Sequence, residues 1–266
     1  MTHLFLLGGH DLEMLAIRDL VLAQCGPAAL VDKHLSWGAK ASDYIADIKT
    51  ALANGQTPVL VELADDLPGK FDRSRLNLVD HHGPRAGADR PSSLHQVFDL
   101  LKLPPECWTR DLELIAANDT GHIRAMREMG ASTAEIRNIR DRDRATQGLG
   151  APDEDEARRA IRARQTLGDL IIIATTSNTS SVIGDLIEPE YGGPGAANLL
   201  ILMPDKAAFF GAGRVVRALA GDPAFAGGWY GGALPERGYW GAPLDGPDDQ
   251  RRPSLPQRIH RLLSLT

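Results

Sequence analysis

The sequence predicts an α/β protein: a doubly wound, mainly parallel sheet in the first half, then a smaller α/β domain, with a cleft between the two. Short apolar runs alternate with longer segments of helical spacing in the first half, which is the pattern of a parallel sheet. At 266 residues, with 43% hydrophobic and 24% charged side chains, the chain resembles ordinary globular proteins that bury a real core. A charged helical segment just after residue 150 then separates two halves of different composition.

The elements of the first half follow from these apolar runs and from the turn residues between them. Strands are expected at residues 4–7, 28–31, 58–63 and 76–79, and helices at 11–24, 41–53, 91–103 and 110–118. Gly26-Pro27 and Asn54-Gly55 end the first two helices, because glycine and proline favour helix termination.

The second half begins with a helix that opens at Pro152 and carries acid–arginine pairs four residues apart, Glu154 with Arg158 and Asp155 with Arg159. Strands are then expected at 170–173, 199–202 and 207–210, helices at 180–187 and 214–220, and a loop at 243–256. These elements predict three parts: a first domain at 1–150, a connecting helix at 151–167 and a second domain at 168–266.

Composition excludes several classes of protein. A formal net charge of -6 argues against a protein that coats nucleic acid through bulk positive charge. The two cysteines, Cys25 and Cys107, provide neither a disulfide framework nor a zinc knuckle. The longest apolar stretches are too short to span a bilayer, and the first residues lack the basic start of a secretion signal. We therefore expect a cytoplasmic protein with no membrane partner.

Polar residues follow the predicted strands at the points where the strands end. The first strand leads into His10-Asp11-Leu12-Glu13, the third ends in Glu62, and the fourth ends in Asp80-His81-His82. Asp119 follows the helix at 110–118. Because the carboxyl ends of parallel strands meet at one edge of a sheet, we expect these groups to converge.

Several carboxylates brought together repel one another and raise one another's pKa values, and a divalent cation removes that penalty. Mixed carboxylate and imidazole ligands suit Mn²⁺, with Co²⁺, Fe²⁺ or Zn²⁺ as alternatives and Mg²⁺ less favoured. The sequence therefore predicts a site for divalent metal ions.

The ordered set of these motifs resembles the DHH phosphoesterase superfamily, which includes RecJ-type exonucleases, nano-RNases, pAp phosphatases and manganese pyrophosphatases. The second half resembles the DHH-associated C-terminal domain, with a Gly-x-Gly-Arg before a helix and a later glycine cluster. The chain departs from the family pattern at Glu13 and Glu62, where aspartate is usual, and its glycine cluster holds Trp229 and Tyr230 where the family has a histidine.

The resemblance implies roles for particular residues. Two metal ions would be bound. One ion would be held by His10, Asp11 and Glu62, and the other by Glu13, Glu62, His81 and Asp119. Asp80 would orient a ligand, and His82 would act beside the reacting phosphate as hydrogen-bond donor or general acid. Substrate would be held from the second domain by Arg214, which follows Gly211 and Gly213, and by the cluster that starts at Gly227 and Gly228.

The function that this implies is hydrolysis of a phosphoester in a small phosphorylated or nucleotide substrate, extending to a short oligonucleotide, by a two-metal mechanism. The partner is then a small molecule, and the sequence leaves open whether the chain forms a homodimer. Inorganic pyrophosphatase fits less well, because the second half has no clustered positive charges.

Two other interpretations compete with a hydrolase. The glutamates and the missing histidine would also suit a module that binds a phosphorylated ligand without turnover. Gly8-Gly9 after the first strand suggests a dinucleotide-dependent oxidoreductase, but no G-x-G-x-x-G follows that strand. The aromatic residues Trp229, Tyr230, Tyr239 and Trp240 would either stack a nucleobase or pack in the core.

Overall fold

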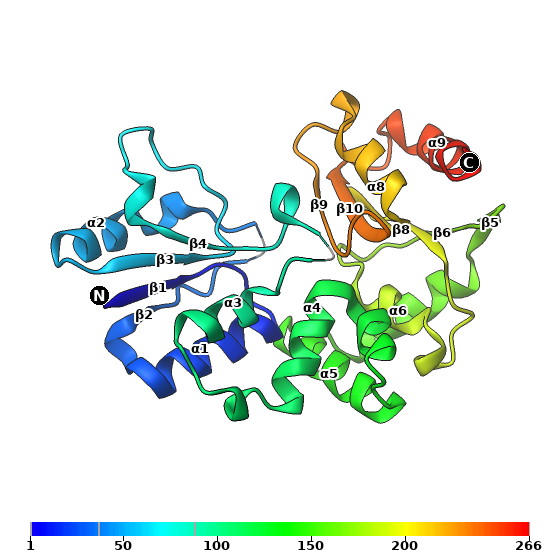
Figure 1. Ribbon diagram of the computed structural model, residues 1–266. Coiled ribbons are helices and arrows are strands. Elements are labelled where there is room, and N and C mark those ends of the chain that lie inside the picture. Colours follow the sequence, from blue (N-terminus) through cyan, green and yellow to red (C-terminus); the bar gives the residue numbers. More distant parts are fainter. Residues whose placement is uncertain (1, 37, 88, 266) are drawn as a thin grey trace. The chain divides into compact units, whose positions relative to one another are not determined.

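The computed structural model describes residues 2–36, 38–87 and 89–265, which form two compact units (Figure 1). The first unit comprises Met1–His81 and Pro91–His122, and the second comprises His82–Arg90 and Ile123–Thr266. The three parts predicted from the sequence, at 1–150, 151–167 and 168–266, remain a prediction.

The first unit is built on a parallel sheet of four strands in the order β2-β1-β3-β4. These strands are β1 (His3–Leu7), β2 (Leu30–Val31), β3 (Thr57–Val61) and β4 (Asn77–Val79). Leu7 pairs with Val61, and Val61 pairs with Val79, so the strands β1, β3 and β4 end level with one another. This register brings the segments that follow the strands to one edge.

The strands of this sheet are apolar on both faces, as expected of parallel strands, so both faces must be covered by helices. They are α1 (Leu12–Cys25), α2 (Ile45–Ala53), α3 (Ser93–Leu100) and the first part of α4 (Arg110–Glu128). Leu4, Leu6 and Leu60 pack in one core cluster with Tyr44 and Ile48 around α2. Alternate residues of β1, such as Phe5, point to the opposite face and are equally buried.

Short 3-10 turns connect these elements. In the first unit they cover Pro27–Ala29, Ala41–Tyr44, Arg73–Arg75 and Pro105–Cys107. In the second unit they cover Gly83–Arg85, Pro189–Tyr191 and Pro223–Phe225.

The second unit contains a mixed sheet of six strands in the order β5-β6-β7-β8-β10-β9, in which only β6 and β7 run parallel. The strands are β5 (Gln165–Leu167), β6 (Leu170–Ala174), β7 (Asn198–Leu202), β8 (Lys206–Ala212), β9 (Trp229–Gly231) and β10 (Arg237–Pro243). The helices are α5 (Thr133–Thr146), α6 (Ala151–Arg162), α7 (Ser181–Leu186), α8 (Gly213–Ala220) and α9 (Arg251–Ser264). One face of the sheet packs against α8 and α9, and the other packs against α6 and α7.

The predicted fold class is confirmed: the chain is α/β, its first sheet is parallel, and a second α/β sheet follows. The strands expected at 4–7, 76–79, 170–173 and 199–202 are present within one residue at either end. Of the expected acid–arginine pairs, Glu154 and Arg158 lie 3.5 Å apart, whereas Arg159 pairs with Glu156 at 2.9 Å.

Some expected elements were wrong. The strand expected at 28–31 begins only at Leu30, because Pro27–Ala29 form a 3-10 turn. The helix expected to end at residue 118 continues to Glu128, with a break at Gly121 and His122, where His122 adopts a φ of 58°. The loop expected at 243–256 gives way to α9 from residue 251, because Pro253 falls in the first turn, where a missing N–H costs nothing.

Besides α9, four elements were missed. The connecting helix expected at 151–167 ends at Arg162 as α6, and its last residues form strand β5 instead. The helix α5 has a sequence signal, since Ser132 caps it and Glu135 completes a capping box. Strands β9 and β10 are rich in glycine and carry no clear strand pattern. Among the described residues, no helix is both long and apolar enough to cross a membrane.

Candidate metal centre

The centre forms where β3 and β4 end. Glu62 directly follows β3, and His81 lies two residues beyond β4. The backbone N–H of Glu62 donates a hydrogen bond to the carbonyl of Val79 at 2.8 Å, which extends the strand pairing by one bond. Two segments far apart in the sequence are therefore held side by side at this edge.

Glu62 leaves the strand with a left-handed backbone, at a φ of 52°. This conformation is uncommon for a residue with a side chain and costs energy unless the surroundings enforce it. Gly8 allows it: a Cβ atom at Gly8 would collide with the carbonyl groups of Glu62 and Val61. The end of β1 thus approaches Glu62 closely only because residue 8 is glycine.

Glu13 and Asp119 reach the same place from helices. Glu13 lies in the first turn of α1, and its Oε1 accepts a hydrogen bond of 2.9 Å from the backbone N–H of Leu94, at the start of α3. Asp119 lies in the last turn of α4 before the break at Gly121. Both side chains thus come from helices of the first unit.

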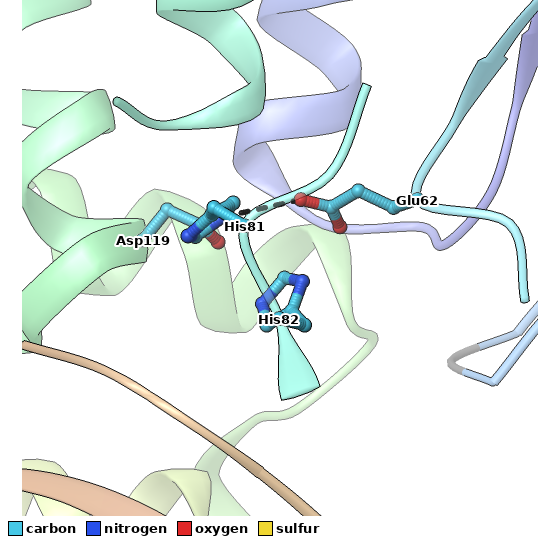
Figure 2. A group of neighbouring side chains, drawn as sticks. All are labelled: Glu62, His81, His82 and Asp119. Carbon is cyan, nitrogen blue, oxygen red and sulfur yellow. Dashed lines mark ion pairs between the residues drawn. The ribbon is translucent and has the colours of Figure 1, made fainter. Parts of the chain in front are cut away.

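The imidazole of His81 is at the middle of these groups. Its Nε2 lies 2.5 Å from Oδ2 of Asp119, 3.3 Å from Oε1 of Glu62 and 3.9 Å from Oε2 of Glu13. Glu62, His81 and Asp119 offer ligand atoms that all lie within 4.8 Å of one another. Figure 2 shows these three side chains together with His82, the next residue in the chain.

Burial and crowding shift the pKa values of these groups strongly. Burial raises the pKa of Glu13 well above its usual range, and the neighbouring charges of Asp119 and Glu62 raise it further. Burial by itself lowers the pKa of His81, but the carboxylates of Asp119, Glu62 and Glu13 outweigh it and raise that pKa to about 12. Without a metal ion, the imidazolium of His81 therefore lies among carboxylates, while Glu13 favours its neutral form.

The donor set fits a divalent transition metal. Oε2 of Glu13 and Oδ2 of Asp119 are buried oxygens that accept no hydrogen bond from the described residues, although both lie near His81. Oxygen atoms that point to one place and are not used in hydrogen bonds can bind a cation together. Three carboxylates and one imidazole are ligands that suit Mn²⁺ and neighbouring ions.

Two expected ligands lie outside this cluster. Asp11 caps α1, where its Oδ1 accepts a hydrogen bond of 2.9 Å from the backbone N–H of Met14. The exposed ring of His10 lies edge-on to His34, with the ring centroids 5.7 Å apart. The structure thus brings together the ligands expected for one ion more closely than those expected for the other.

The expected catalytic pair occupies the segment around His81. Asp80 is half-buried, and its backbone carbonyl accepts a hydrogen bond of 3.2 Å from the side chain of Gln96 on α3. His82 begins the second unit, where its ring lies 6.4 Å from that of Tyr239 on β10.

The expected substrate-binding residues have packing roles in the second unit. The guanidinium of Arg214 donates to the carbonyls of Leu262, Leu263 and Leu265, so that it caps the end of α9. The glycines permit close backbone packing. A Cβ at Gly211 would meet Asn198, one at Gly213 would meet the carbonyl of Pro235, and one at Gly228 would meet the carbonyl of Gly241.

Gly227 has open space around it and adopts a φ of 83°. Glycine accepts this left-handed backbone without strain. Its role is therefore to turn the chain just before β9.

The sequence did not indicate two contributors to the centre. Gly8 was considered only as part of a dinucleotide motif, although a glycine at a strand end also signals close approach of another backbone. The N–H of Leu94 holds Glu13 across 81 positions in the chain, and no local pattern reveals such a bond.

A scan of protein-family models and a search of curated proteins find no match to the chain. The search of solved structures finds a pGpG-specific phosphodiesterase, PggH, from Vibrio cholerae, at 13% identity and a TM-score of 0.40, covering 98% of this chain and 99% of that one. It also finds an exonuclease RecJ bound to manganese, at 13% identity and a TM-score of 0.44, covering 99% and 90%.

An uncharacterized protein from Helicobacter pylori G27 matches at 14% identity and a TM-score of 0.30, covering 98% and 99%. All three similarities extend over almost the whole chain.

Proposed function

We propose that the protein is a metal-dependent phosphoesterase of the DHH kind that hydrolyses a small phosphorylated or nucleotide substrate. The observation that carries this proposal is the convergence of three carboxylates on the buried imidazole of His81. Such a donor set has little structural use, since burying like charges together costs free energy. A bound divalent ion would remove this cost, because its positive charge attracts the carboxylates that otherwise repel one another.

The ligands of the proposed ion are Glu13, Glu62, His81 and Asp119. A bound divalent ion would polarise the phosphoryl group and lower the pKa of a bound water. The resemblance to DHH phosphoesterases adds a second ion with His10 and Asp11 among its ligands, and this two-metal mechanism is part of the proposal. We favour Mn²⁺ for both positions, on the chemistry of the donor atoms.

The chain's own residues would do the remaining work. Leu94 fixes one carboxylate oxygen of Glu13, so that the other oxygen stays directed at the centre. We assign His82 as the donor that protonates the leaving oxygen, which is the ordinary role of a histidine beside a reacting phosphate. Asp80 is proposed to orient a neighbouring ligand.

The alternative function is a module that binds a phosphorylated ligand without turnover. It is favoured by the positions of His10 and Asp11 outside the cluster. A centre with one ion would bind a phosphate but would lack the second charge that a two-metal mechanism needs.

Hydrolysis measured against metal content separates the two functions. The assay uses bis-p-nitrophenyl phosphate and a panel of short nucleotides with Mn²⁺, Co²⁺, Mg²⁺ or EDTA, and elemental analysis gives the number of bound ions. We expect turnover that requires Mn²⁺, is abolished by EDTA and is lost in His81→Ala. The control His3→Ala, which removes another imidazole of the first unit, should keep full activity.

Bound metal without turnover on any substrate of the panel would favour the binding module. The absence of both bound metal and turnover would overturn the proposal. Thermal unfolding of His81→Ala is measured alongside, so that loss of the centre is not confused with loss of the fold.

A further inference from the structure

The strands β1 and β2 also end at the edge of the first sheet where polar residues gather. They pair in parallel, with Leu6 opposite Val31. Each strand is followed within a few residues by groups that bind metal ions: His10 follows β1, and Asp32 and His34 follow β2. Because the carboxyl ends of parallel strands lie together, these groups become neighbours at this edge.

A buried tyrosine holds the two strand ends together. The hydroxyl of Tyr44 donates a hydrogen bond of 2.6 Å to the carbonyl of Leu7, the last residue of β1. It also accepts a hydrogen bond of 3.1 Å from the backbone N–H of Lys33, which lies between the two polar residues after β2. Tyr44 is 0% exposed, so both bonds are shielded from water. The two segments are therefore held in a fixed relation to each other.

Asp32 sets the position of His34. Its Oδ1 accepts a hydrogen bond of 2.8 Å from the backbone N–H of His34, which stabilises a left-handed backbone at a φ of 51°. Its other oxygen, Oδ2, lies 3.5 Å from Nδ1 of the same imidazole. That separation is long for a hydrogen bond. It is close to the distance of about 3.4 Å between two ligand atoms of one tetrahedral zinc ion.

The ring of His10 lies beside this pair. Its centroid is 5.7 Å from that of His34, with an angle of 80° between the ring planes. Two imidazoles that bind one tetrahedral zinc ion have centroids roughly 5–6 Å apart. Among the described residues, the groups around His81 are the ones whose ligand atoms all lie within 4.8 Å of one another. His10 therefore has to turn its ring to complete the set, and as an exposed side chain it can do so.

The charges around these residues leave room for a cation. The ammonium of Lys33 is engaged by Asp47 at 2.8 Å and donates to the carbonyl of Asp43. The side chain of Asp32 is only 13% exposed, and within the described part of the chain it forms no ion pair with a lysine or an arginine. Since an imidazole carries little charge above about pH 7, His34 does not neutralise this carboxylate.

We propose that His10, Asp32 and His34 form a second metal site of the first unit, separate from the centre around His81, and that this site binds Zn²⁺. Two imidazoles and one carboxylate are a ligand set of zinc sites that keep a fourth position open. The exposure of both rings leaves that position to water or a small anion. The inference does not rest on the proposed function. It pairs His10 with His34, whereas the two-metal mechanism pairs His10 with Asp11.

Calorimetric titration of the full chain with Zn²⁺ gives the number of bound ions. We expect the wild type to bind one more ion than His34→Asn. Modification by diethyl pyrocarbonate, read by mass spectrometry, then identifies the histidines that the ion covers. Zn²⁺ should protect His10 and His34 from modification, while the exposed His95 stays reactive.

Asparagine is the replacement at residue 34 because it accepts a left-handed backbone and has no imidazole. His10→Asn should lose the same ion as His34→Asn. Asp32→Asn should weaken the binding of that ion at least about tenfold, because asparagine can keep the bond to the backbone N–H but has no negative charge. The control His95→Asn removes an exposed imidazole of the same unit, and it should bind as many ions as the wild type.

Equal numbers of zinc ions in the wild type and in His34→Asn would overturn the proposal. Loss of an ion in His10→Asn but not in His34→Asn would also overturn it, and would support the pairing of His10 with Asp11 instead. If His95→Asn weakened zinc binding as much as His34→Asn does, the binding would be adventitious and the site would be refuted. Thermal unfolding of each variant in EDTA confirms that the fold is kept.

Discussion

Replacing Glu13 by glutamine should change stability in opposite directions with and without metal. The side chain is 1% exposed, and its Oε1 accepts from the backbone N–H of Leu94, a bond that glutamine can keep. Because the pKa of Glu13 is raised, the folded chain favours its neutral form, which glutamine imitates. Without metal at about pH 8, Glu13→Gln should therefore be at least as stable as the wild type.

With metal the order should reverse. At about 100 times the dissociation constant, an ion adds about 2.7 kcal/mol to the free energy of unfolding of the wild type. If loss of this ligand weakens binding about 100-fold, the same concentration adds only about 0.4 kcal/mol to the variant. At about 2–4 °C per kcal/mol, the metal-induced rise in Tm should be roughly 5–11 °C in the wild type and about 1–2 °C in the variant.

Thermal unfolding of both chains in EDTA and in Mn²⁺ measures these shifts. The matched control is Glu113→Gln, because Glu113 is a glutamate of the same unit that is 46% exposed and pairs with Arg110. It should respond to Mn²⁺ like the wild type. A metal-free variant that is less stable than the wild type, or equal metal-induced shifts in both, would refute a ligand role for Glu13.

Three further predictions concern pH and two buried positions. The pKa of His81 is raised from 6.5 to about 12 without metal, so its contribution to stability is fully present below pH 6.5 and declines as the pH rises towards 12. Since an ion must displace that proton, the Mn²⁺-induced rise in Tm should grow between about pH 6 and about pH 8. Gly8→Ala should lower both Tm and Mn²⁺ affinity, because its Cβ would collide with the backbone of Glu62. Asp185→Asn should lower the free energy of unfolding by about 3–5 kcal/mol, because it removes a fully buried carboxylate that pairs with both Arg140 and Arg144, while Asp143 stays paired with Arg140.

Each of these three has an outcome that would contradict it. A metal-induced shift that is the same at both pH values would mean that no proton leaves His81 on binding. Unchanged Mn²⁺ affinity in Gly8→Ala would show that the backbone of Glu62 tolerates displacement. A loss of less than about 1 kcal/mol in the free energy of unfolding of Asp185→Asn would mean that the ion pair of Asp185 with Arg140 is as weak as an exposed salt bridge.

The end of β4 was predictable because its signal is local: the apolar run stops at Asp80-His81. The strand predicted at 58–63 ends two residues earlier, at Val61, because Glu62 leaves the strand with a left-handed backbone. The parallel arrangement requires the two ends to share an edge. Donor chemistry could likewise be inferred, since carboxylates and imidazole limit the kinds of ion that bind.

Which residues face one another could not be predicted in the same way. Asp11 and Glu13 are two residues apart in one motif, yet Asp11 caps α1 while Glu13 reaches the centre. Arg214 follows glycines, as a phosphate-binding residue would, but its donors meet carbonyls at the end of α9. That helix was not expected, so neither was its cap.

The sequence by itself therefore determined the α/β class, the end of β4 and the chemistry of the centre, because period, turn residues and donor types are properties of short segments. Only the tertiary structure decided that Asp11 caps α1 while Glu13 reaches His81, and that Trp229 and Tyr239 lie on the face opposite Trp240. Those choices depend on backbone approach and register between segments that are distant in the chain, and no local pattern encodes either.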